Sequence, residues 1–232
     1  MLKKAGKKKV NYKKIIIVLA IIILVGLAVF YYYSLRVKAI YVVGNNLLKE
    51  KEILESTNLL SYPKLYEVSE TDIKASLKDN KLINNIRVKK SLSGTITIEI
   101  SENKVLFQKK DGKYVLSSKD EVELDTLLLG IPTLINDCTD VQNKLIDRLI
   151  LVDDDILKHI SEIEYKPTDL DKERFMFYMS DMNYVYITLS KINLINSYNE
   201  IYPTLEGKKG ILYLDSGNHF EIKEKEEVKD NN

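Results

Sequence analysis

The longest apolar run in the chain lies near its N-terminus. Residues Ile15–Phe30 include no charged or strongly polar side chain, and Tyr31, Tyr32 and Tyr33 follow directly. As a helix, these roughly 19 residues would extend about 28 Å, close to the thickness of the hydrocarbon core of a bilayer. Tyrosines are also common where a membrane helix meets the lipid headgroups. The pattern therefore predicts a single N-terminal transmembrane helix over residues 15–33.

The charges before this run predict its orientation. A basic tip, residues 1–14, contains lysines and no acidic residue: Lys3, Lys4, Lys7, Lys8, Lys9, Lys13 and Lys14. Because positive charge is normally retained on the cytoplasmic side, we expect a type II protein of the cell membrane with its later domains outside. A cleaved signal peptide is the alternative, with Gly26 and Ala28 as a poor cleavage site. Since the apolar run continues past that site, a retained anchor is preferred.

Residues 34–102 show the pattern of a small α+β domain. Strand, helix, helix, strand and strand are expected in that order, over Arg36–Gly44, Leu47–Leu60, a helix capped by Ser69, Ile86–Lys90 and Thr95–Ile100. This order predicts a three-stranded sheet with both helices on one face. Its core is expected to contain Ile40, Val42, Ile53, Ile73, Leu77, Ile96 and Ile98.

Residues 103–222 are richer in strands, and predict a mixed, mainly antiparallel β domain with flanking helices. The strand-like segments are Val105–Lys109, Lys113–Ser117, Glu121–Leu124, Glu162–Lys166, Arg174–Met179, Tyr184–Leu189, Gly210–Asp215 and His219–Ile222. Helical spacing occurs over Val141–Leu151, over Ile156–Ile160 and in a segment capped by Ser190. Residues 223–232 are almost all charged or amide, and we expect them to be disordered.

Composition disfavours several function classes. Lys and Arg total 35 and Asp and Glu 34, so without the seven N-terminal lysines the chain is acidic, which argues against nucleic-acid binding. Cys138 is the only cysteine, and a small buried hydrophobe is a better interpretation of it than a nucleophile. His159 and His219 have no partner at a ligand or base spacing, and no common catalytic motif is present. We therefore expect a protein that is not an enzyme and needs no cofactor or small-molecule substrate.

The run Asp153–Asp155 suggests a metal site, because clustered carboxylates ligate hard cations. The same residues would also cap and charge-match the N-terminus of the helix expected at Ile156–Ile160. Capping is the preferred interpretation, and no metal is expected.

Several of these features together resemble the FtsQ/DivIB cell-division proteins. They are the basic tip, the single membrane helix and a β-α-α-β-β module that begins VKAIYVVGNN and resembles the family's POTRA domain. His159–Ile163 with Pro167, and Lys191–Phe220, resemble the Gram-positive DivIB branch. The chain departs from the family at Ser93-Gly94, where Pro-Asn is usual, and at Met182, where a turn glycine is common and a wider hairpin is expected. It also departs at His219, where the family has tyrosine.

The resemblance implies a scaffold of the divisome at the division septum. Such a scaffold binds the DivIC (FtsB-like) and FtsL-like division proteins outside the membrane, supports septum formation and helps regulate the septal peptidoglycan synthase. A membrane-anchored POTRA-type module for protein assembly or transport is the alternative.

The last strands also predict a sheet edge whose N–H and C=O groups could accept a partner's strand. The expected partner-binding residues, with Phe220 as anchor, are Tyr198, Tyr202, Leu212, Tyr213, Leu214, His219, Phe220, Glu221 and Ile222. An ordinary edge protected by the charged tail is the alternative.

Overall fold

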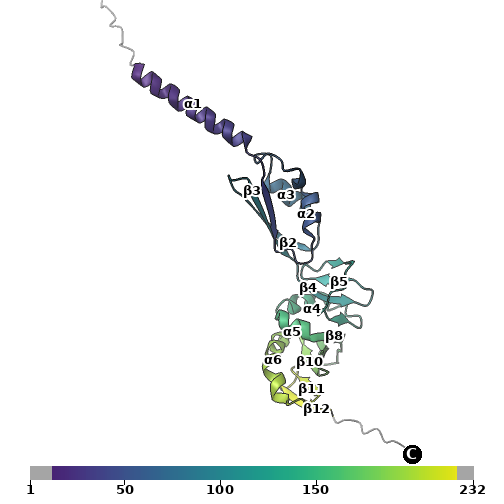
Figure 1. Cartoon of the computed structure of the whole chain (residues 1–232). Coiled ribbons are helices and arrows are strands. Elements are labelled where there is room, and N and C mark those ends of the chain that lie inside the picture. The colour runs from purple at the N-terminus through teal and green to yellow at the C-terminus, as the bar shows by residue number, and fades with distance from the viewer. Residues whose placement is uncertain (1–11, 224–232) are drawn as a thin grey trace, which may run out of the picture. The chain divides into compact units, whose positions relative to one another are not determined.

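Figure 1 shows a computed structural model of the chain, which describes residues 12–223. The chain divides into two compact units, Met1–Glu102 and Asn103–Asn232. Five of the seven N-terminal lysines and nearly all of the tail expected to be disordered lie outside the described residues.

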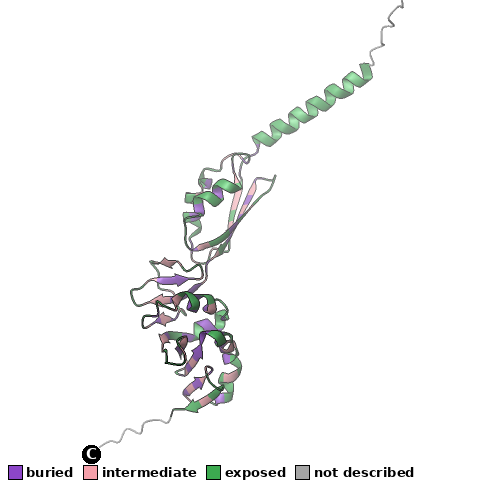
Figure 2. Cartoon of the chain, turned by 180° about the vertical axis from the view of Figure 1, so that it is seen from behind, coloured by how far each residue is buried: buried purple, intermediate pink, exposed green. Residues whose placement is uncertain are grey.

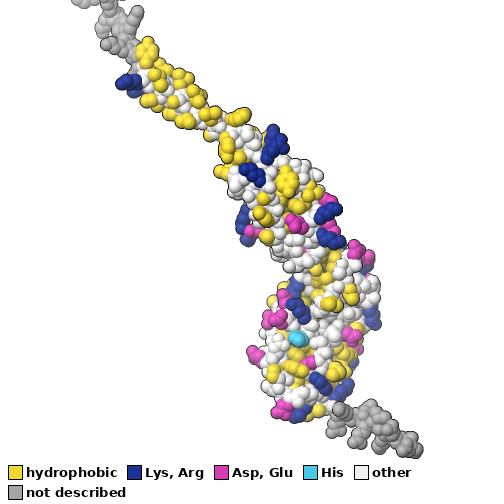
Figure 3. All heavy atoms as spheres, in the orientation of Figure 1, with side chains coloured by type: hydrophobic (Ala, Val, Ile, Leu, Met, Phe, Trp, Pro, Cys, Tyr) yellow, Lys and Arg dark blue, Asp and Glu magenta, His cyan; other side chains and the backbone are white. Residues whose placement is uncertain are grey.

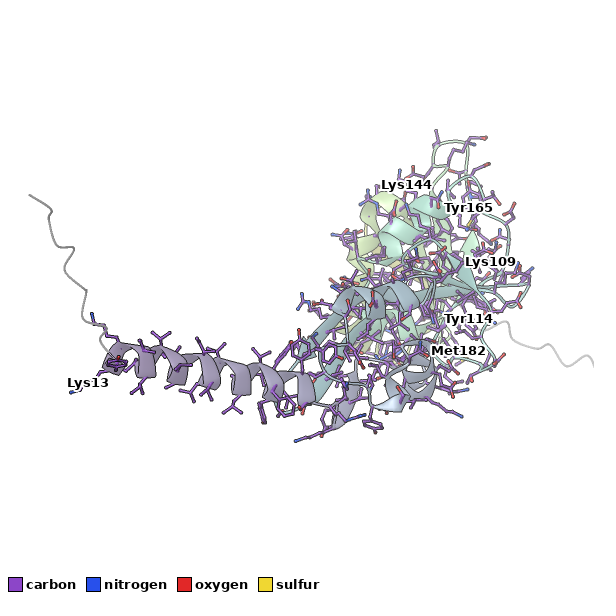
Figure 4. All side chains as sticks on the ribbon, turned by 90° about the horizontal axis from the view of Figure 1, so that it is seen from above. Lys13, Lys109, Tyr114, Lys144, Tyr165 and Met182 are labelled. Carbon is purple, nitrogen blue, oxygen red and sulfur yellow. The ribbon has the colours of Figure 1, made fainter. Side chains whose placement is uncertain are left out.

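The first helix, α1 (Tyr12–Ser34), is exposed along its whole length (Figure 2). It begins before the apolar run, so that Lys13 lies in its first turn (Figure 4). Its last turn ends with a hydrogen bond from Ser34 Oγ to the Phe30 carbonyl, 2.8 Å long. Among the described residues, α1 is the one helix that is long and apolar enough to cross a membrane.

The rest of the first unit contains the β-α-α-β-β order that the sequence predicts. Its strands β1 (Ala39–Val43), β2 (Ile83–Lys90) and β3 (Thr95–Glu102) form a sheet in the order β1-β3-β2. Strand β1 runs parallel to β3, and β2 runs antiparallel to it. The helices α2 (Glu50–Ser56) and α3 (Glu70–Leu77), with the 3-10 turn η1 (Leu59–Ser61), cover one side of the sheet (Figure 1).

The predicted core of this unit is confirmed at five positions, and at the two others the side chain is only partly buried. Five of the expected residues are buried, and they come from α2, α3 and β3: Ile53, Ile73, Leu77, Ile96 and Ile98. Ile40 and Val42 are only partly buried, because β1 is an edge strand. Ser69 caps α3 as predicted, accepting a hydrogen bond from the Asp72 N–H.

The second unit is built on one mixed sheet of nine strands. They are β4 (Val105–Lys109), β5 (Tyr114–Leu116), β6 (Glu121–Val122), β7 (Thr133–Leu134), β8 (Ile160–Tyr165), β9 (Arg174–Met179), β10 (Tyr184–Thr188), β11 (Gly210–Tyr213) and β12 (His219–Ile222). Their order is β12-β11-β10-β9-β8-β7-β4-β5-β6. The pairs β4–β7, β7–β8 and β10–β11 are parallel and the other pairs are antiparallel, which confirms a mixed, mainly antiparallel sheet.

Helical segments pack on one face of this sheet. They are α4 (Gln142–Leu149), α5 (Asp154–His159), η2 (Leu189–Ser197), α6 (Tyr198–Ile201) and η3 (Tyr202–Leu205). One buried cluster joins Ile146 of α4 and Ile195 of η2 to Phe177 and Val185 of the sheet. Cys138 belongs to this cluster and is 2% exposed, which confirms it as a buried apolar residue.

One predicted cap is wrong, and the other takes its predicted position, with Asp154 and Asp155 in the first turn of α5. Ser190 lies inside η2, which is a 3-10 helix with a kink at Lys191, and the capping position is Thr188. Asp153 takes the capping position of α5 without a side-chain hydrogen bond to the helix. Asp154, in the first turn, instead pairs with Lys104, with Oδ1 and Nζ 2.6 Å apart. Within residues 12–223, no group of three or more potential ligands could hold a metal ion.

Candidate partner-binding site

Strand β12 forms one edge of the nine-stranded sheet. It pairs with β11 in antiparallel register, Leu212 opposite Phe220 and Tyr213 opposite His219. Among the described strands, none pairs with its other side. The edge therefore presents main-chain groups for which the described part of the sheet has no partner strand.

The register shows which main-chain groups face outward. Beyond the end of β12, the Lys223 N–H donates a hydrogen bond to the Lys209 carbonyl, 2.9 Å long. Hydrogen-bonded and non-hydrogen-bonded pairs alternate along an antiparallel ladder, so Glu221 also bonds to β11. Phe220 and Ile222 occupy the alternate positions. Their N–H and C=O groups point away from β11, toward the open edge.

The side chain of Phe220 holds β12 against the core. Phe220 and Leu212 lie opposite each other on the same face of the sheet, and Phe220 packs against the buried cluster. Its ring also lies over Gly210, where a Cβ atom would come within 2.8 Å of Phe220 Cζ. Phe220 is therefore half-buried and fixes the edge strand. Ile222, two residues further along β12, is 52% exposed.

An aromatic row lies on the other face of the same strands. The rings of Tyr213 and His219 stack with centroids 4.6 Å apart, and Tyr213 stacks on Tyr186 of β10 at 5.4 Å. The guanidinium of Arg174 lies 3.7 Å from the centroid of Tyr186. Tyr213 Oη donates a hydrogen bond to Glu221 Oε2, and this bond, with burial, raises the pKa of Tyr213. The row therefore ends at the sheet edge with the neutral phenol of Tyr213 and the exposed imidazole of His219.

The loop between β11 and β12 is held by Asp215. Arg174 Nε lies 2.6 Å from Asp215 Oδ2, and Lys191 Nζ donates to the Asp215 carbonyl at 2.7 Å. Burial alone would raise the pKa of Asp215, but hydrogen bonds from Arg174 and Ser216 lower it. Asp215 is therefore a half-buried carboxylate that fixes the turn into the edge strand.

Tyr198 supports the site from inside. It is 3% exposed, and its hydroxyl donates to Asp181 Oδ2 at 2.8 Å and accepts from Asn183 Nδ2 at 3.2 Å. Asn183 Oδ1 in turn accepts a hydrogen bond from the Gly210 N–H at 2.9 Å. Burial and the hydrogen bond to Asp181 raise the pKa of Tyr198. This network connects α6 and the β9–β10 turn to the start of β11.

The nine predicted site residues thus fall into three groups. Tyr202, His219, Glu221 and Ile222 are exposed; Tyr213 and Phe220 are half-buried. Tyr198, Leu212 and Leu214 are buried in the core, so their side chains cannot touch a partner while the domain is folded.

Several contributors were not predicted from the sequence, among them Arg174, Asn183 and Tyr186. The alternation of Tyr184, Val185, Tyr186 and Ile187 could have placed Tyr186 on the face opposite the core. The roles of Arg174 and Asn183 depend on contacts that the sequence pattern does not show.

Comparisons with known proteins match both units. The family description "POTRA domain, FtsQ-type" matches residues 35–103. The cell division protein DivIB of Listeria monocytogenes is 29% identical over 234 residues, covering 95% of this chain and 85% of the relative. DivIB of Bacillus subtilis is 26% identical over 235 residues, covering 95% of this chain and 87% of the relative.

Among solved structures, the major extracytoplasmic domain of DivIB from Geobacillus stearothermophilus, trans isomer, is similar. It is 23% identical with a TM-score of 0.38, and covers 46% of this chain and 96% of that one.

The matched POTRA domain, the similarity to DivIB over most of the chain and the apolar helix α1 agree with one another. By its POTRA domain and its similarity over most of its length, the chain resembles the FtsQ/DivIB cell-division proteins, and α1 has the length and apolar composition of a membrane anchor.

Proposed function

We propose that this protein is a divisome scaffold that binds DivIC (FtsB-like) and FtsL-like proteins through the open edge of β12. Through them it supports septum formation and regulates the septal peptidoglycan synthase. The observation that carries the binding site is the free edge at Phe220 and Ile222, whose outward main-chain groups follow from the β11–β12 register. The relatives are described as cell division proteins, which supports a partner in the same process.

Strand addition accounts for the chemistry of this edge. A partner strand beside β12 would receive main-chain hydrogen bonds from Phe220 and Ile222, which give affinity with little dependence on side chains. Selectivity would come from the side chains beside that strand, namely the apolar Ile222 and the polar His219 and Glu221. Phe220, Gly210 and the Tyr198 network keep the edge in place.

A proline at an outward position tests this proposal. Ile222→Pro removes an N–H that faces the partner and leaves the bonds from β12 to β11 in place. We expect it to abolish capture of DivIC and FtsL homologues by the full-length protein in detergent. Ile222→Ala is the matched control, because it removes the same side chain and keeps the N–H; it should retain most of the binding. The circular dichroism of both variants should equal that of the wild type.

Equal loss in both variants would assign the binding to the Ile222 side chain instead of the main chain. Equal retention in both would place the partner surface elsewhere, with the POTRA domain as the next candidate.

We also infer a type II orientation at the septum. The two lysines described at the start of α1, Lys13 and Lys14, belong to the basic tip, and basic residues are retained in the cytoplasm. Protease added to intact protoplasts should remove the region after Ser34, and a fluorescent fusion should collect at division sites. Protection of that region would contradict the orientation, and uniform membrane fluorescence would contradict the septal location.

A further inference from the structure

The first residues after α1 are held by two loops of the POTRA domain. The Leu65 N–H donates to the Leu35 carbonyl at 2.9 Å, and the Val37 N–H donates to the Pro63 carbonyl at 3.0 Å. The Lys38 N–H donates to the carbonyl of Gly94, in the β2–β3 hairpin, at 2.8 Å. Both loops are therefore fixed beside the chain as it leaves α1.

The contact at Gly94 is especially close. Gly94 has φ +90°, and a Cβ atom there would lie 2.5 Å from the Arg36 carbonyl oxygen. The hairpin tip can approach the linker this closely because residue 94 has no side chain. The position of the hairpin beside the end of α1 is thus built into the backbone.

These segments form a surface of basic, aromatic and apolar residues, which we call the membrane-proximal surface. It consists of Arg36, Lys38, Tyr62, Lys64, Tyr66, Lys89, Lys90 and Leu92. Leu92, at the hairpin tip, is 70% exposed. Dark blue and yellow side chains gather together where α1 ends and the domain begins (Figure 3).

Basic residues outnumber acidic ones on this surface. Three carboxylates lie beside it: Glu67 accepts a hydrogen bond from the Lys64 main-chain N–H, Glu99 pairs with Lys89, and Glu70 lies near Lys90 and pairs with Lys74. Arg36 and Lys38 are exposed. The far end of the same sheet instead exposes uncharged residues, among them Asn84 and Ser101. The positive charge of the sheet is therefore concentrated at the end nearest α1.

Chain length places this surface within reach of the headgroups. Lys38 is four residues beyond the end of α1 at Ser34, which even a fully extended chain could separate by only about 14 Å. The interfacial layer of a bilayer extends about 5–7 Å beyond the hydrocarbon core on each side. The hydrogen bonds to Leu35, Val37 and Lys38 bring the two loops to the same level.

We propose that the membrane-proximal surface binds the anionic phosphate headgroups of the leaflet from which the C-terminal end of α1 emerges. Arg36, Lys38 and Lys64 attract the phosphates, and the exposed Leu92 and Tyr62 enter the interfacial layer. Continuity with the membrane helix and the excess of positive charge favour lipid over a protein as the occupant. The binding holds the POTRA domain against the bilayer.

The test uses the full-length protein reconstituted into nanodiscs, with Leu92→Cys carrying a fluorophore. The native Cys138 is buried and is spared by the label. Quenching by lipids with a spin label near the headgroup reports contact with the membrane. A second label position, Asn84→Cys at the far end of the sheet, serves as the reference.

We expect strong quenching at position 92 and little at 84 in discs of anionic phosphatidylglycerol. The quenching at position 92 should fall in discs of neutral phosphatidylcholine. It should also fall at about 1 M salt, because the Debye screening length is then about 3 Å. The variant Arg36→Gln/Lys38→Gln/Lys64→Gln should shift the docked-to-free ratio by up to about a hundredfold, at about fivefold for each basic residue. The control Lys49→Gln/Lys51→Gln/Lys78→Gln changes the net charge equally and should leave the quenching unchanged.

Three results would overturn the proposal. Equal quenching at positions 92 and 84 would show that the surface does not face the lipid. The quenching at position 92 could also be the same in anionic and neutral lipid and in the Arg36/Lys38/Lys64 variant. Proximity to α1 alone, and not headgroup binding, would then place the hairpin there. If position 92 is quenched only by aqueous iodide, the surface is open to water and is left for a protein partner.

Discussion

Phe220 lies directly over Gly210, across the last two strands of the sheet. A Cβ atom on Gly210 would come within 2.8 Å of Phe220 Cζ and 2.0 Å of the Glu221 carbonyl oxygen. Since the second of these atoms belongs to the backbone, a side chain at position 210 cannot be accommodated by a rotamer change. The position of β12 at the sheet edge therefore depends on the absence of one methyl group at residue 210.

Gly210→Ala should displace β12 from β11. We expect a loss of about 1–3 kcal/mol in the free energy of unfolding, the usual cost of overpacking, measured by urea denaturation. Gly207→Asn is the control, because Gly207 has φ +78° and open space around it, and Asn tolerates that conformation. If both variants unfold at the same urea concentration as the wild type, the close contact does not constrain the edge.

A carboxylate determines where the first helix of the POTRA domain begins. Glu102 accepts hydrogen bonds from the main-chain N–H groups of Leu47 and Leu48, at 3.0 and 2.9 Å. Glu102→Gln removes the negative charge from these bonds and should lower the free energy of unfolding by about 1–2 kcal/mol. Glu99→Gln on the same strand breaks only an exposed pair with Lys89, and should cost less than about 1 kcal/mol. Urea denaturation of both full-length variants measures the difference, and equal losses would contradict this role of Glu102.

The contacts of Glu102 show why the order of helices and strands could be predicted from the sequence better than the residues at which they begin. The period of the apolar residues predicted α1, the β-α-α-β-β order and the long strands β9 and β10, because burial on one face leaves a local pattern. The helix expected from Leu47 begins at Glu50 instead. Its preceding N–H groups bond to Glu102, which lies more than 50 positions later in the chain. No local pattern contains that information.

The candidate site shows the same division. The alternation in Gly210–Asp215 and His219–Ile222 predicted two terminal strands, and both formed. Burial of Tyr198, Leu212 and Leu214 could not be predicted, because all three are apolar or aromatic residues that suit a core and an interface equally well. Which main-chain groups of β12 face outward depends on the register, and the register is a property of the folded sheet.

Met182 occupies a backbone conformation that suits glycine. The β9–β10 hairpin is tight, with the Met179 N–H bonded to the Asn183 carbonyl, and Met182 has φ +71°. The prediction of a wider hairpin from the missing glycine is thus wrong. The turn stays tight, and Met182 adopts the strained left-handed conformation in place of glycine.

Met182→Gly should therefore stabilise the protein. The side chain is 71% exposed, so little packing is lost. Removing the strain of the left-handed conformation should raise the free energy of unfolding by about 1–2 kcal/mol. The greater conformational freedom of glycine in the unfolded chain offsets about 0.5–1 kcal/mol of this gain. We expect a higher thermal midpoint. Asn218→Gly is the control at φ +47°, where asparagine is already tolerated and no gain should follow. A lower midpoint for Met182→Gly would contradict the assignment of strain.

The Arg174–Asp215 pair should make stability depend on acid pH. Hydrogen bonding to Arg174 and Ser216 lowers the pKa of Asp215 against the opposing effect of burial. A carboxyl whose pKa is lower in the folded state adds stability above its unfolded value, near 3.8, and loses it as the pH falls through the folded value. Asp215→Asn should therefore be less stable than the wild type near neutral pH, and the difference should shrink below about pH 4. Urea denaturation across this range measures it, and a difference that does not change with pH would assign the effect to packing.

Cys138 should be unreactive in the folded protein. Burial, and then the charge of Asp137, raise the pKa of its thiol to about 11, so the thiolate that reacts with disulfide reagents is scarce near neutral pH. The thiol is also 2% exposed, which blocks access by the reagent. We expect Ellman's reagent to react slowly with the native chain and rapidly after denaturation in urea. The exposed thiol of Leu92→Cys should react rapidly under native conditions, with one equivalent released before unfolding and the second after it. If both thiols react at the same rate in the native protein, the region around Cys138 opens to solvent without global unfolding, and the buried cluster between α4 and the sheet is less stable than its packing indicates.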